Sequence, residues 1–119
     1  MRNTLRITSL SIVLATGAIP SCAPDSDPGA RIWRKRCAAC HGLDGAGRTR
    51  FAEGRPFANL TDGRWKHGPD RASLRRLVAD GDPGSTMPPF AGRLTPEEID
   101  AVVDHALKLA AAGSAGAKP

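Results

Sequence analysis

Apolar residues recur at helical spacing in the last third of the chain and predict its longest helix. They form one broad stripe, which consists of Ile99, Val102, Val103, Ala106, Leu107 and Leu109. Thr95 as the N-cap, Pro96 at the first helical position and Glu98 three residues after the cap form a capping box, which predicts where this helix begins. Residues 110–119 are rich in Ala and Gly, so we expect the helix to fray there and residues 111–119 to form a flexible tail.

Two shorter helices are predicted upstream of this one. A middle helix is expected over residues 69–80, because this stretch begins with a proline, carries apolar residues at i, i+3 and i+4, and precedes a glycine. The apolar residues are Leu74, Leu77 and Val78, and the glycine is Gly81. The first helix is expected to begin at Pro28, with Asp27 as its cap, and to run through Trp33 to a pair of cysteines.

The stretches between the helices predict loops. Residues 42–47 contain three glycines, which are expected to form tight turns. Residues 48–63 predict an irregular loop with three apolar residues that plug the fold, namely Phe51, Phe57 and Leu60. The chain is therefore predicted to be all-α.

The sequence Cys37-Ala38-Ala39-Cys40-His41 has the C-x-x-C-H pattern that attaches haem c covalently. On a helical turn, positions i, i+3 and i+4 share one face, so both thiols reach the ring and the imidazole offers a nitrogen to the iron. The alternatives are a zinc half-site and a redox disulfide. Zinc requires four ligands, and the sequence has no second cysteine pair or clustered histidines. A thioredoxin-type motif is expected where a strand meets a helix, and no strand pattern precedes Cys37.

The composition is consistent with a cofactor inside the fold. The 119 residues bound the chain to one small domain, predicted over residues 28–110. The whole chain contains two Trp, three Phe and no Tyr, together with 13 Gly and ten Pro. A domain of this size and composition buries little apolar core unaided, so we expect haem to supply part of the core.

The first 21 residues predict a signal peptide. Arg2 and Arg6 form a charged start, and the apolar run over residues 10–19 is too short to span a bilayer. One interpretation is a soluble secretory signal that is cut near Ala18 or Ala23. In that case the domain is free in the periplasm.

The other interpretation is a lipid anchor at Cys22. The sequence Ile19-Pro20-Ser21-Cys22 resembles a bacterial lipobox, although its proline departs from that pattern. Of the three cysteines, two belong to the haem motif, and a remaining free thiol would be a liability in an oxidising periplasm. We therefore expect Cys22 to be lipidated, residues 22–27 to form a short tether, and the exported domain to be held at a bacterial membrane.

The order of these features resembles the class I c-type cytochromes, a family of small bacterial monohaem proteins. The resemblance covers residues 28–110 and includes Met-Pro-Pro-Phe over residues 87–90, which matches the axial-methionine loop of the family. It implies the small cytochrome c fold, with three main helices and loops around one covalent haem c. It also implies Cys37 and Cys40 as the attachment sites, and His41 and Met87 as axial ligands of the iron.

Further residues match the family less specifically. Trp65 and Gly68 resemble a segment of cytochrome domains from oxidase and dehydrogenase systems, and the Trp65 indole is expected either to bind a haem propionate or to pack in the core. Gly29 and Trp33 match the positions where the first and last helices cross. His105 departs from the family, which often has an aromatic residue there, and is expected to loosen the crossing.

Met87 is the candidate for the sixth iron ligand because a soft, neutral thioether favours ferrous iron and raises the reduction potential. The two prolines that follow stiffen its loop, and Met1 leaves with the signal peptide, so Met87 is the only methionine of the mature chain. The alternatives are His67 or His105 as the ligand, an open sixth position, and a purely apolar role for Met87.

With both axial positions filled, the iron has no vacancy, and the resemblance then implies an electron-transfer protein with no catalytic residues rather than an enzyme. The alternative function is a small haem c enzyme or a ligand-binding sensor with an open sixth position. An enzyme would also need acid or base groups aimed at the vacancy, and the sequence shows no such arrangement.

The charge of the chain bears on its partners. The formal net charge is +5, and residues 31–76 hold 12 Lys and Arg against four Asp and Glu. We expect Arg34, Lys35 and Arg36 to rim the haem edge and to attract an acidic redox partner. Nucleic acid is not expected for an exported haem domain. The expected partners of this monomer are a dehydrogenase or quinol oxidoreductase as electron donor, and an oxidase or reductase as acceptor.

Overall fold

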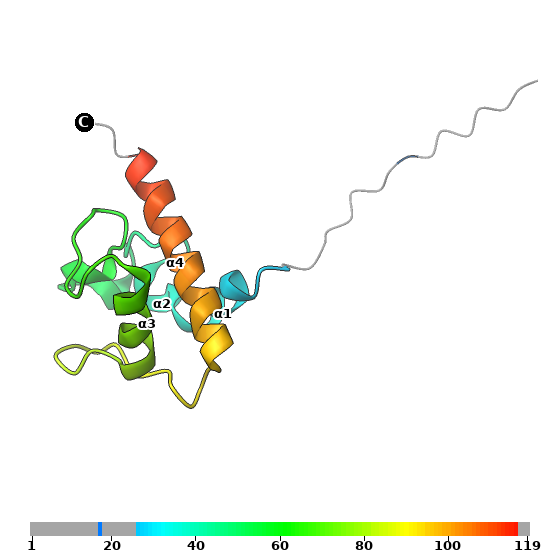
Figure 1. Ribbon diagram of the computed structural model, residues 1–119. Helices are drawn as coiled ribbons and strands as arrows, with labels where there is room; N and C mark the ends of the chain where they lie inside the picture. Colours follow the sequence, from blue (N-terminus) through cyan, green and yellow to red (C-terminus); the bar gives the residue numbers. More distant parts are fainter. Residues whose placement is uncertain (1–16, 18–25, 117–119) are drawn as a thin grey trace, which may run out of the picture.

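The computed structural model describes Gly17 and residues 26–116, and Figure 1 shows their arrangement. Four α-helices and two short 3-10 helices follow one another along this part of the chain. They are α1 (Pro28–Arg36), α2 (Ala38–His41), η1 (Arg50–Ala52), η2 (Pro56–Ala58), α3 (Arg71–Asp80) and α4 (Pro96–Gly116). The described residues contain no strand, only an isolated bridge between Ala91 and Leu94, so the predicted all-α fold is confirmed.

The predicted signal peptide, apart from Gly17, and the lipidation site at Cys22 lie outside the described residues. Within the described part, no helix combines the length and the apolar character that a membrane span needs.

Helix α1 begins where the sequence predicts. The Asp27 carboxylate accepts hydrogen bonds from the backbone N–H groups of Gly29 (2.9 Å) and Ala30 (3.3 Å), and Pro28 occupies the first turn. The helix ends at Cys37, whose N–H donates to the carbonyl of Trp33 at 2.9 Å. The haem motif therefore starts at the C-terminal end of α1 and continues into α2.

Helices α1 and α4 lie against each other, as Figure 1 shows, and the contact is close at Gly29. A Cβ atom at this position would overlap the backbone carbonyl of Ala101, so only glycine fits. Trp33 is 4% exposed in the same interface, and the His105 ring lies beside it with 5.8 Å between ring centroids. The predicted crossing positions are confirmed. His105 packs against Trp33 at the position where the family often has an aromatic residue, and the expected loosening of the crossing stays a prediction.

Helix α3 begins at Arg71, two residues later than predicted. The Asp70 carboxylate caps the helix by accepting from the Ser73 N–H at 2.9 Å, so the acidic cap rather than Pro69 sets the start. The predicted end is confirmed, because the chain leaves the helix at Gly81 with a φ of 72°.

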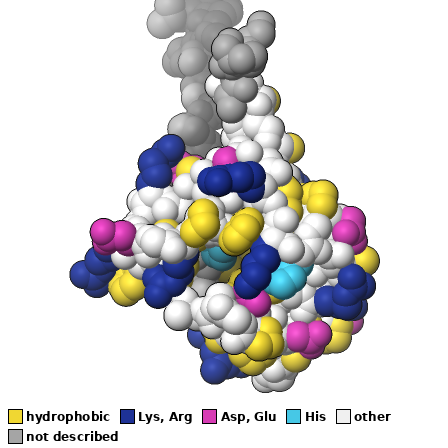
Figure 2. Space-filling view, turned by 90° about the vertical axis from the view of Figure 1, so that its left-hand side faces the viewer, with side chains coloured by type: hydrophobic (Ala, Val, Ile, Leu, Met, Phe, Trp, Pro, Cys, Tyr) yellow, Lys and Arg dark blue, Asp and Glu magenta, His cyan; other side chains and the backbone are white. Residues whose placement is uncertain are grey.

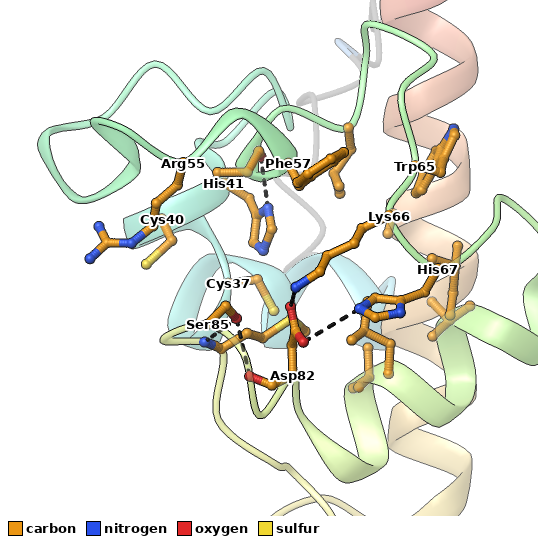
Figure 3. Close-up of a pocket in the computed structure, with 18 of the residues that line it drawn as sticks. Cys37, Cys40, His41, Arg55, Phe57, Trp65, Lys66, His67, Asp82 and Ser85 are labelled. Carbon is orange, nitrogen blue, oxygen red and sulfur yellow. Dashed lines mark hydrogen bonds and ion pairs between the residues drawn. The ribbon is translucent and has the colours of Figure 1, made fainter.

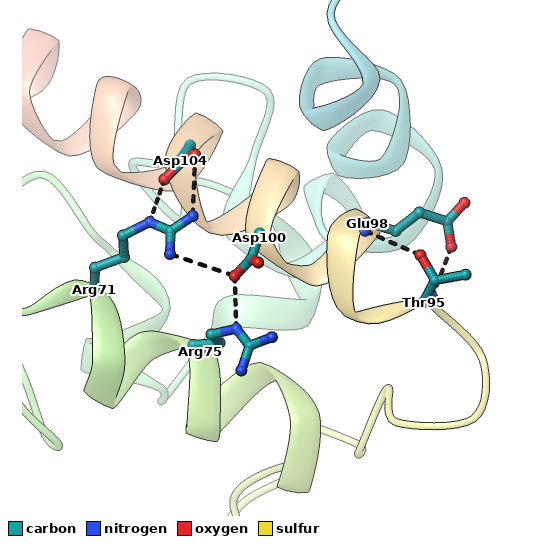
Figure 4. A network of polar contacts seen from close by, with 6 residues as sticks. All are labelled: Arg71, Arg75, Thr95, Glu98, Asp100 and Asp104. Atoms are coloured by element: carbon teal, nitrogen blue, oxygen red, sulfur yellow. Dashed lines mark hydrogen bonds and ion pairs between the residues drawn. The ribbon is translucent and has the colours of Figure 1, made fainter.

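Helices α3 and α4 pack through a small apolar cluster and a set of ion pairs. The cluster consists of Leu74, Ile99 and Val103. On the exposed side, Arg71 binds Asp104 (2.7 Å), and Arg75 binds Asp100 (2.6 Å), as Figure 4 shows. The same view shows the predicted capping box of α4, in which Thr95 and Glu98 exchange hydrogen bonds of 2.9 and 3.2 Å.

Helix α4 continues past residue 110 to Gly116, so residues 111–116 are helical rather than part of a tail. Contacts with the loops explain the extra turns. Gly113 lies directly against the Thr61 side chain, and Leu109 lies against Gly45. These contacts outweigh the low helix propensity of glycine.

The loop over residues 48–63 is more regular than predicted, because it contains η1 and η2. Its aromatic residues are also less buried than predicted. Phe51 and Phe57 are each 47% exposed, and Phe51 lies under the guanidinium of Arg50, 4.7 Å from the ring centroid. Phe51 is therefore not a plug of the core, whereas Phe57 and Leu60 face the cavity described next.

Candidate haem-binding site

The described residues enclose a cavity of about 500 Å³, within the usual range of ligand sites. Figure 2 shows it as a hollow with a histidine side chain inside and apolar and basic side chains around its edge. All of the predicted site residues line it, and these are Cys37, Cys40, His41, Trp65 and Met87. The structure therefore brings together residues from the junction of α1 and α2, from α2 and from two separate loops, and the close-up in Figure 3 shows many of the residues that line the cavity.

The two cysteines sit at the cavity and form no disulfide with each other. Cys37 is half-buried and Cys40 is exposed, and burial together with the neighbouring Cys40 raises the pKa of the Cys37 thiol to about 11. The motif is held in shape by the N–H groups of Cys40 and His41, which both donate to the Cys37 carbonyl, and by the Thr49 hydroxyl, which donates to the Cys40 carbonyl at 2.9 Å. Among the residues that the structure describes, no cluster of three or more His, Cys, Asp and Glu side chains could hold zinc.

A hydrogen bond to a backbone carbonyl orients the His41 ring so that it can bind a metal. Its Nδ1 lies 2.8 Å from the carbonyl oxygen of Ala58, which can only accept, so Nδ1 carries the proton and donates. The lone pair is then on Nε2 and is available to a metal, in the arrangement common for metal-binding histidines. Burial lowers the pKa of His41, although the hydrogen bond to Ala58 acts in the opposite direction. The lowered pKa favours the neutral imidazole that metal ligation requires.

The Trp33 ring packs against the His41 ring. The two rings lie 5.6 Å apart, centroid to centroid, and the Trp33 Nε1–H donates to the Gly42 carbonyl at 3.0 Å. The Gly47 N–H donates to the His41 carbonyl at 2.7 Å, so the glycine turn after the motif is tied to the motif itself. These contacts leave His41 little freedom to rotate.

Met87 comes to the cavity from the loop that follows α3. Gly81 starts this loop with a positive φ, and a Cβ atom there would lie 2.7 Å from the Pro89 nitrogen, so the turn depends on glycine. The Met87 carbonyl accepts from the Asp82 N–H at 3.1 Å, and the Met87 N–H donates to the Ser85 hydroxyl at 3.1 Å. The half-buried side chain of Met87 thus lines the same cavity as His41.

The two rival ligands are placed less favourably. His67 lines the cavity, but its Nε2 lies 3.4 Å from an oxygen of the Asp82 carboxylate. His105 does not line the cavity and packs on Trp33. Trp65 is half-buried, lines the cavity and packs against the cluster of Leu74, Ile99 and Val103, so it has the contacts of a core residue, and its bond to a haem propionate stays a prediction.

The charged residues around the cavity are mostly basic, and sequence reasoning identified few of them. The lining includes Arg36, Arg55, Arg64 and Lys66, with Asp82 as the only carboxylate among the lining residues. Of the three basic residues expected at the rim, Arg36 lines the cavity, whereas Arg34 and Lys35 do not. No sequence motif links Asp82 to Lys66 or the Ala58 carbonyl to His41, because these pairs are 16 and 17 residues apart.

This donor set fits haem c. The cavity offers two thiols three residues apart, a neutral histidine with a free Nε2, a thioether from a separate loop, and apolar walls that include Val102, Val103 and Phe90. The basic residues at its edge would compensate the charges of the two haem propionates.

Known proteins with similar sequences and structures are cytochromes. Residues 24–105 match the family model described as "Cytochrome C oxidase, cbb3-type, subunit III". The chain is 37% identical over 87 residues to the cbb3-type cytochrome c oxidase subunit FixP of Azorhizobium caulinodans, which covers 73% of this chain and 28% of that protein. It is also 32% identical over 112 residues to chloroplastic cytochrome c6 of Chlamydomonas reinhardtii, which covers 92% of this chain and 71% of that one.

The crystal structure of cytochrome c6 from the diatom Phaeodactylum tricornutum is similar to this chain, with a TM-score of 0.59 and 32% identity. The similarity covers 72% of this chain and 94% of the diatom protein. The predicted cytochrome c fold is therefore confirmed, although the chain spans only about a quarter of the length of the first cbb3-type relatives. The chain belongs to the c-type cytochromes of the family described as cytochrome C oxidase, cbb3-type, subunit III, and its cofactor is covalently bound haem c.

Proposed function

We propose that this chain is a monohaem one-electron carrier of a respiratory chain, with His41 and Met87 as the two axial ligands of its iron. The observation that carries the proposal is that the two side chains line one cavity, with His41 held by Ala58 so that its Nε2 remains free. With His41 and Met87 holding both axial positions, the haem would supply a one-electron centre with no position left for a substrate at the iron.

Each residue of the site has a separate part in this function. Cys37 and Cys40 form the thioether bonds, and His41 and Met87 ligate the iron. The haem supplies a centre that takes up and releases one electron. The bond from His41 to the Ala58 carbonyl increases the basicity of the imidazole, and the apolar walls limit water at the site. Because these groups are fixed before transfer, little rearrangement accompanies the change of charge.

The alternative, an enzyme or sensor with an open sixth position, has less support. It requires Met87 to leave the iron, and an enzyme further requires an acid or base aimed at the vacancy. Among the titratable side chains that line the cavity, Lys66 and His67 both contact the Asp82 carboxylate, so these three groups are engaged with one another's charges rather than free to act as an acid or base. Since the similar proteins are electron-transfer cytochromes, a carrier rather than a catalyst is the function that we propose.

The proposed partners are redox proteins. A dehydrogenase or quinol oxidoreductase would be the donor and an oxidase or reductase the acceptor, and relatives named as subunits of cbb3-type oxidases support an oxidase in particular. We place the carrier in the periplasm as a monomer, and at the membrane surface if Cys22 is lipidated.

Electron transfer to an anionic reagent should depend strongly on salt. For oxidation of the ferrous protein by ferricyanide, measured by stopped flow, we expect the rate to fall about threefold to tenfold between ~0.01 M and ~1 M salt, because the screening length falls from ~30 Å to ~3 Å. Arg36→Glu should lower the low-salt rate about threefold and flatten the salt dependence, since Arg36 lines the cavity. Lys35→Glu should have a smaller effect.

The matched control is Arg93→Glu, which reverses an exposed charge that does not line the cavity and should leave the rate within about twofold of wild type. A cationic cobalt(III) complex as oxidant should show the opposite salt dependence. If the Arg36 and Arg93 variants changed the oxidation rate equally, the basic residues at the edge of the cavity would have no specific role in attracting the reagent.

The proposed membrane attachment depends on Cys22. If this residue carries a lipid, the wild-type protein should sediment with membranes, because two acyl chains anchor firmly where one is marginal. Cys22→Ser should release the protein or block its processing. Wild-type protein found wholly in the soluble periplasmic fraction would contradict the anchor and leave the cytochrome assignment intact.

A further inference from the structure

Two loops meet across the cavity at the Asp82 carboxylate. Asp82 belongs to the loop that carries Met87, whereas Lys66 and His67 belong to the segment between η2 and α3. The Lys66 Nζ lies 2.7 Å from Oδ2 of Asp82, and the His67 Nε2 lies 3.4 Å from Oδ1. Figure 3 shows the Lys66 and His67 side chains both extending toward Asp82 from their own segment.

Asp82 is also coupled to Met87 through the backbone. Its N–H donates to the Met87 carbonyl at 3.1 Å, and its carbonyl accepts from the Ser85 N–H at 2.9 Å. The Ser85 hydroxyl in turn accepts from the Met87 N–H at 3.1 Å. Residues 82–87 therefore form a closed turn in which a displacement of Asp82 is passed directly to Met87.

The carboxylate of Asp82 is shielded more than those of the other ion pairs that the described residues form. It is 10% exposed, against 22% for Asp62 and 35% for Asp100. The carboxylate also has two partners from the opposite segment, with Lys66 at 2.7 Å and His67 at 3.4 Å. A shielded carboxylate with two partners restrains a loop better than an exposed pair does.

The rest of this loop has few restraints. Its far end is fixed by buried Phe90, whose N–H donates to the Val78 carbonyl at 3.0 Å, and its near end by Gly81 at the end of α3. Between these ends, residues 83–86, 88 and 89 are exposed. The hydrogen bonds within residues 82–87 shape the turn but do not attach it to the other side of the cavity. The ion pair between the Asp82 carboxylate and Lys66 makes that attachment.

We propose that Asp82 is a positioning residue that holds the Met87 loop closed over the iron by linking it to Lys66 and His67. The inference rests on the proposed role of Met87 as the sixth ligand. It adds that the lifetime of the iron–sulfur bond is set in part by a contact that does not touch the iron. This link joins the segment before α3 to the loop after α3, whereas the ion pairs in Figure 4 join α3 to α4.

The test is the rate at which imidazole replaces the methionine in the ferric, haem-loaded protein. At high imidazole concentration this rate reaches the rate of loop opening, which stopped-flow spectroscopy measures directly. Asp82→Asn keeps the size of the side chain and the backbone contacts but removes the charge. We expect it to raise the limiting rate about tenfold, as expected for loss of a shielded, charge-assisted contact.

Asp62→Asn is the matched control. Asp62 pairs with Arg64 inside its own turn, so its loss should leave the limiting rate within about twofold of wild type. Lys66→Gln should act like Asp82→Asn, and the double variant should open no faster than the faster single variant, because both changes remove one contact. Circular dichroism of each variant reports whether the helices remain intact.

The outcomes separate this inference from the proposed ligation. If the wild-type protein has the far-red sulfur-to-iron band and Asp82→Asn opens no faster than Asp62→Asn, the positioning role of Asp82 is wrong and Met87 remains the ligand. If the wild-type protein lacks that band and its imidazole rate rises linearly without a limit, the ligation by Met87 is wrong. Additive effects of the two single variants would also contradict a shared contact.

Discussion

Replacing His41 with alanine is expected to abolish the stable haem-loaded protein. No other described histidine has a ring nitrogen held by a backbone carbonyl at the cavity, so no side chain is in place to substitute for it. Cys37→Ala or Cys40→Ala should weaken the attachment, because one thioether bond then remains. The measurement is the haem content of purified protein, together with extraction by acid-acetone, which removes haem only when it is not covalently bound.

His67→Gln is the control for this prediction. His67 also lines the cavity, but it contacts Asp82, so its loss should leave haem content unchanged. The wild-type protein should retain its haem through acid-acetone extraction. If the solvent removes the haem from wild type, the attachment through Cys37 and Cys40 is wrong.

Replacing Met87 with alanine is expected to open the iron to external ligands. The variant should lose the far-red sulfur-to-iron band in its ferric form and bind carbon monoxide in its ferrous form. The wild-type protein should show the band and should not bind carbon monoxide. If the wild-type loop is open ~1% of the time or less, the apparent affinity for an external ligand should rise about a hundredfold or more in the variant. The reduction potential should fall, since the thioether stabilises ferrous iron.

Met87→His is the matched control, because it supplies another axial ligand from the same position and should keep carbon monoxide out. Carbon monoxide binding to the wild-type protein would favour the alternative function with an open sixth position. An unchanged spectrum in Met87→Ala would assign the sixth position to another residue, with His67 as the cavity-lining candidate.

The features that could be predicted from the sequence are those set by neighbours in the chain. The capping of α1 by Asp27, the capping box at Thr95 and the helical face of the haem motif depend on residues within four positions of one another. The start of α3 was predicted two residues early, because Pro69 and Asp70 are both signals for a helix start and the sequence does not rank them.

Features that depend on distant residues could not be predicted. The Ala- and Gly-rich end of α4 stays helical because Gly113 packs on Thr61, and composition carries no information about that contact. The exposure of Phe51 depends in the same way on where the loop lies. The carbonyl of Ala58, which orients His41, belongs to the backbone and leaves no mark on the residue type.

The placement of His41 and Met87 at one cavity also has a consequence for chain entropy. The two residues are 46 positions apart, and η1, η2 and α3 lie between them. When both ligate one iron atom, the metal closes a loop of that length, as a disulfide would. By the relation used for disulfides, the restraint on the unfolded chain amounts to at most about 4 kcal/mol. In the proposed ligation, the bond that tunes the redox centre would thus also be a long-range crosslink of the polypeptide.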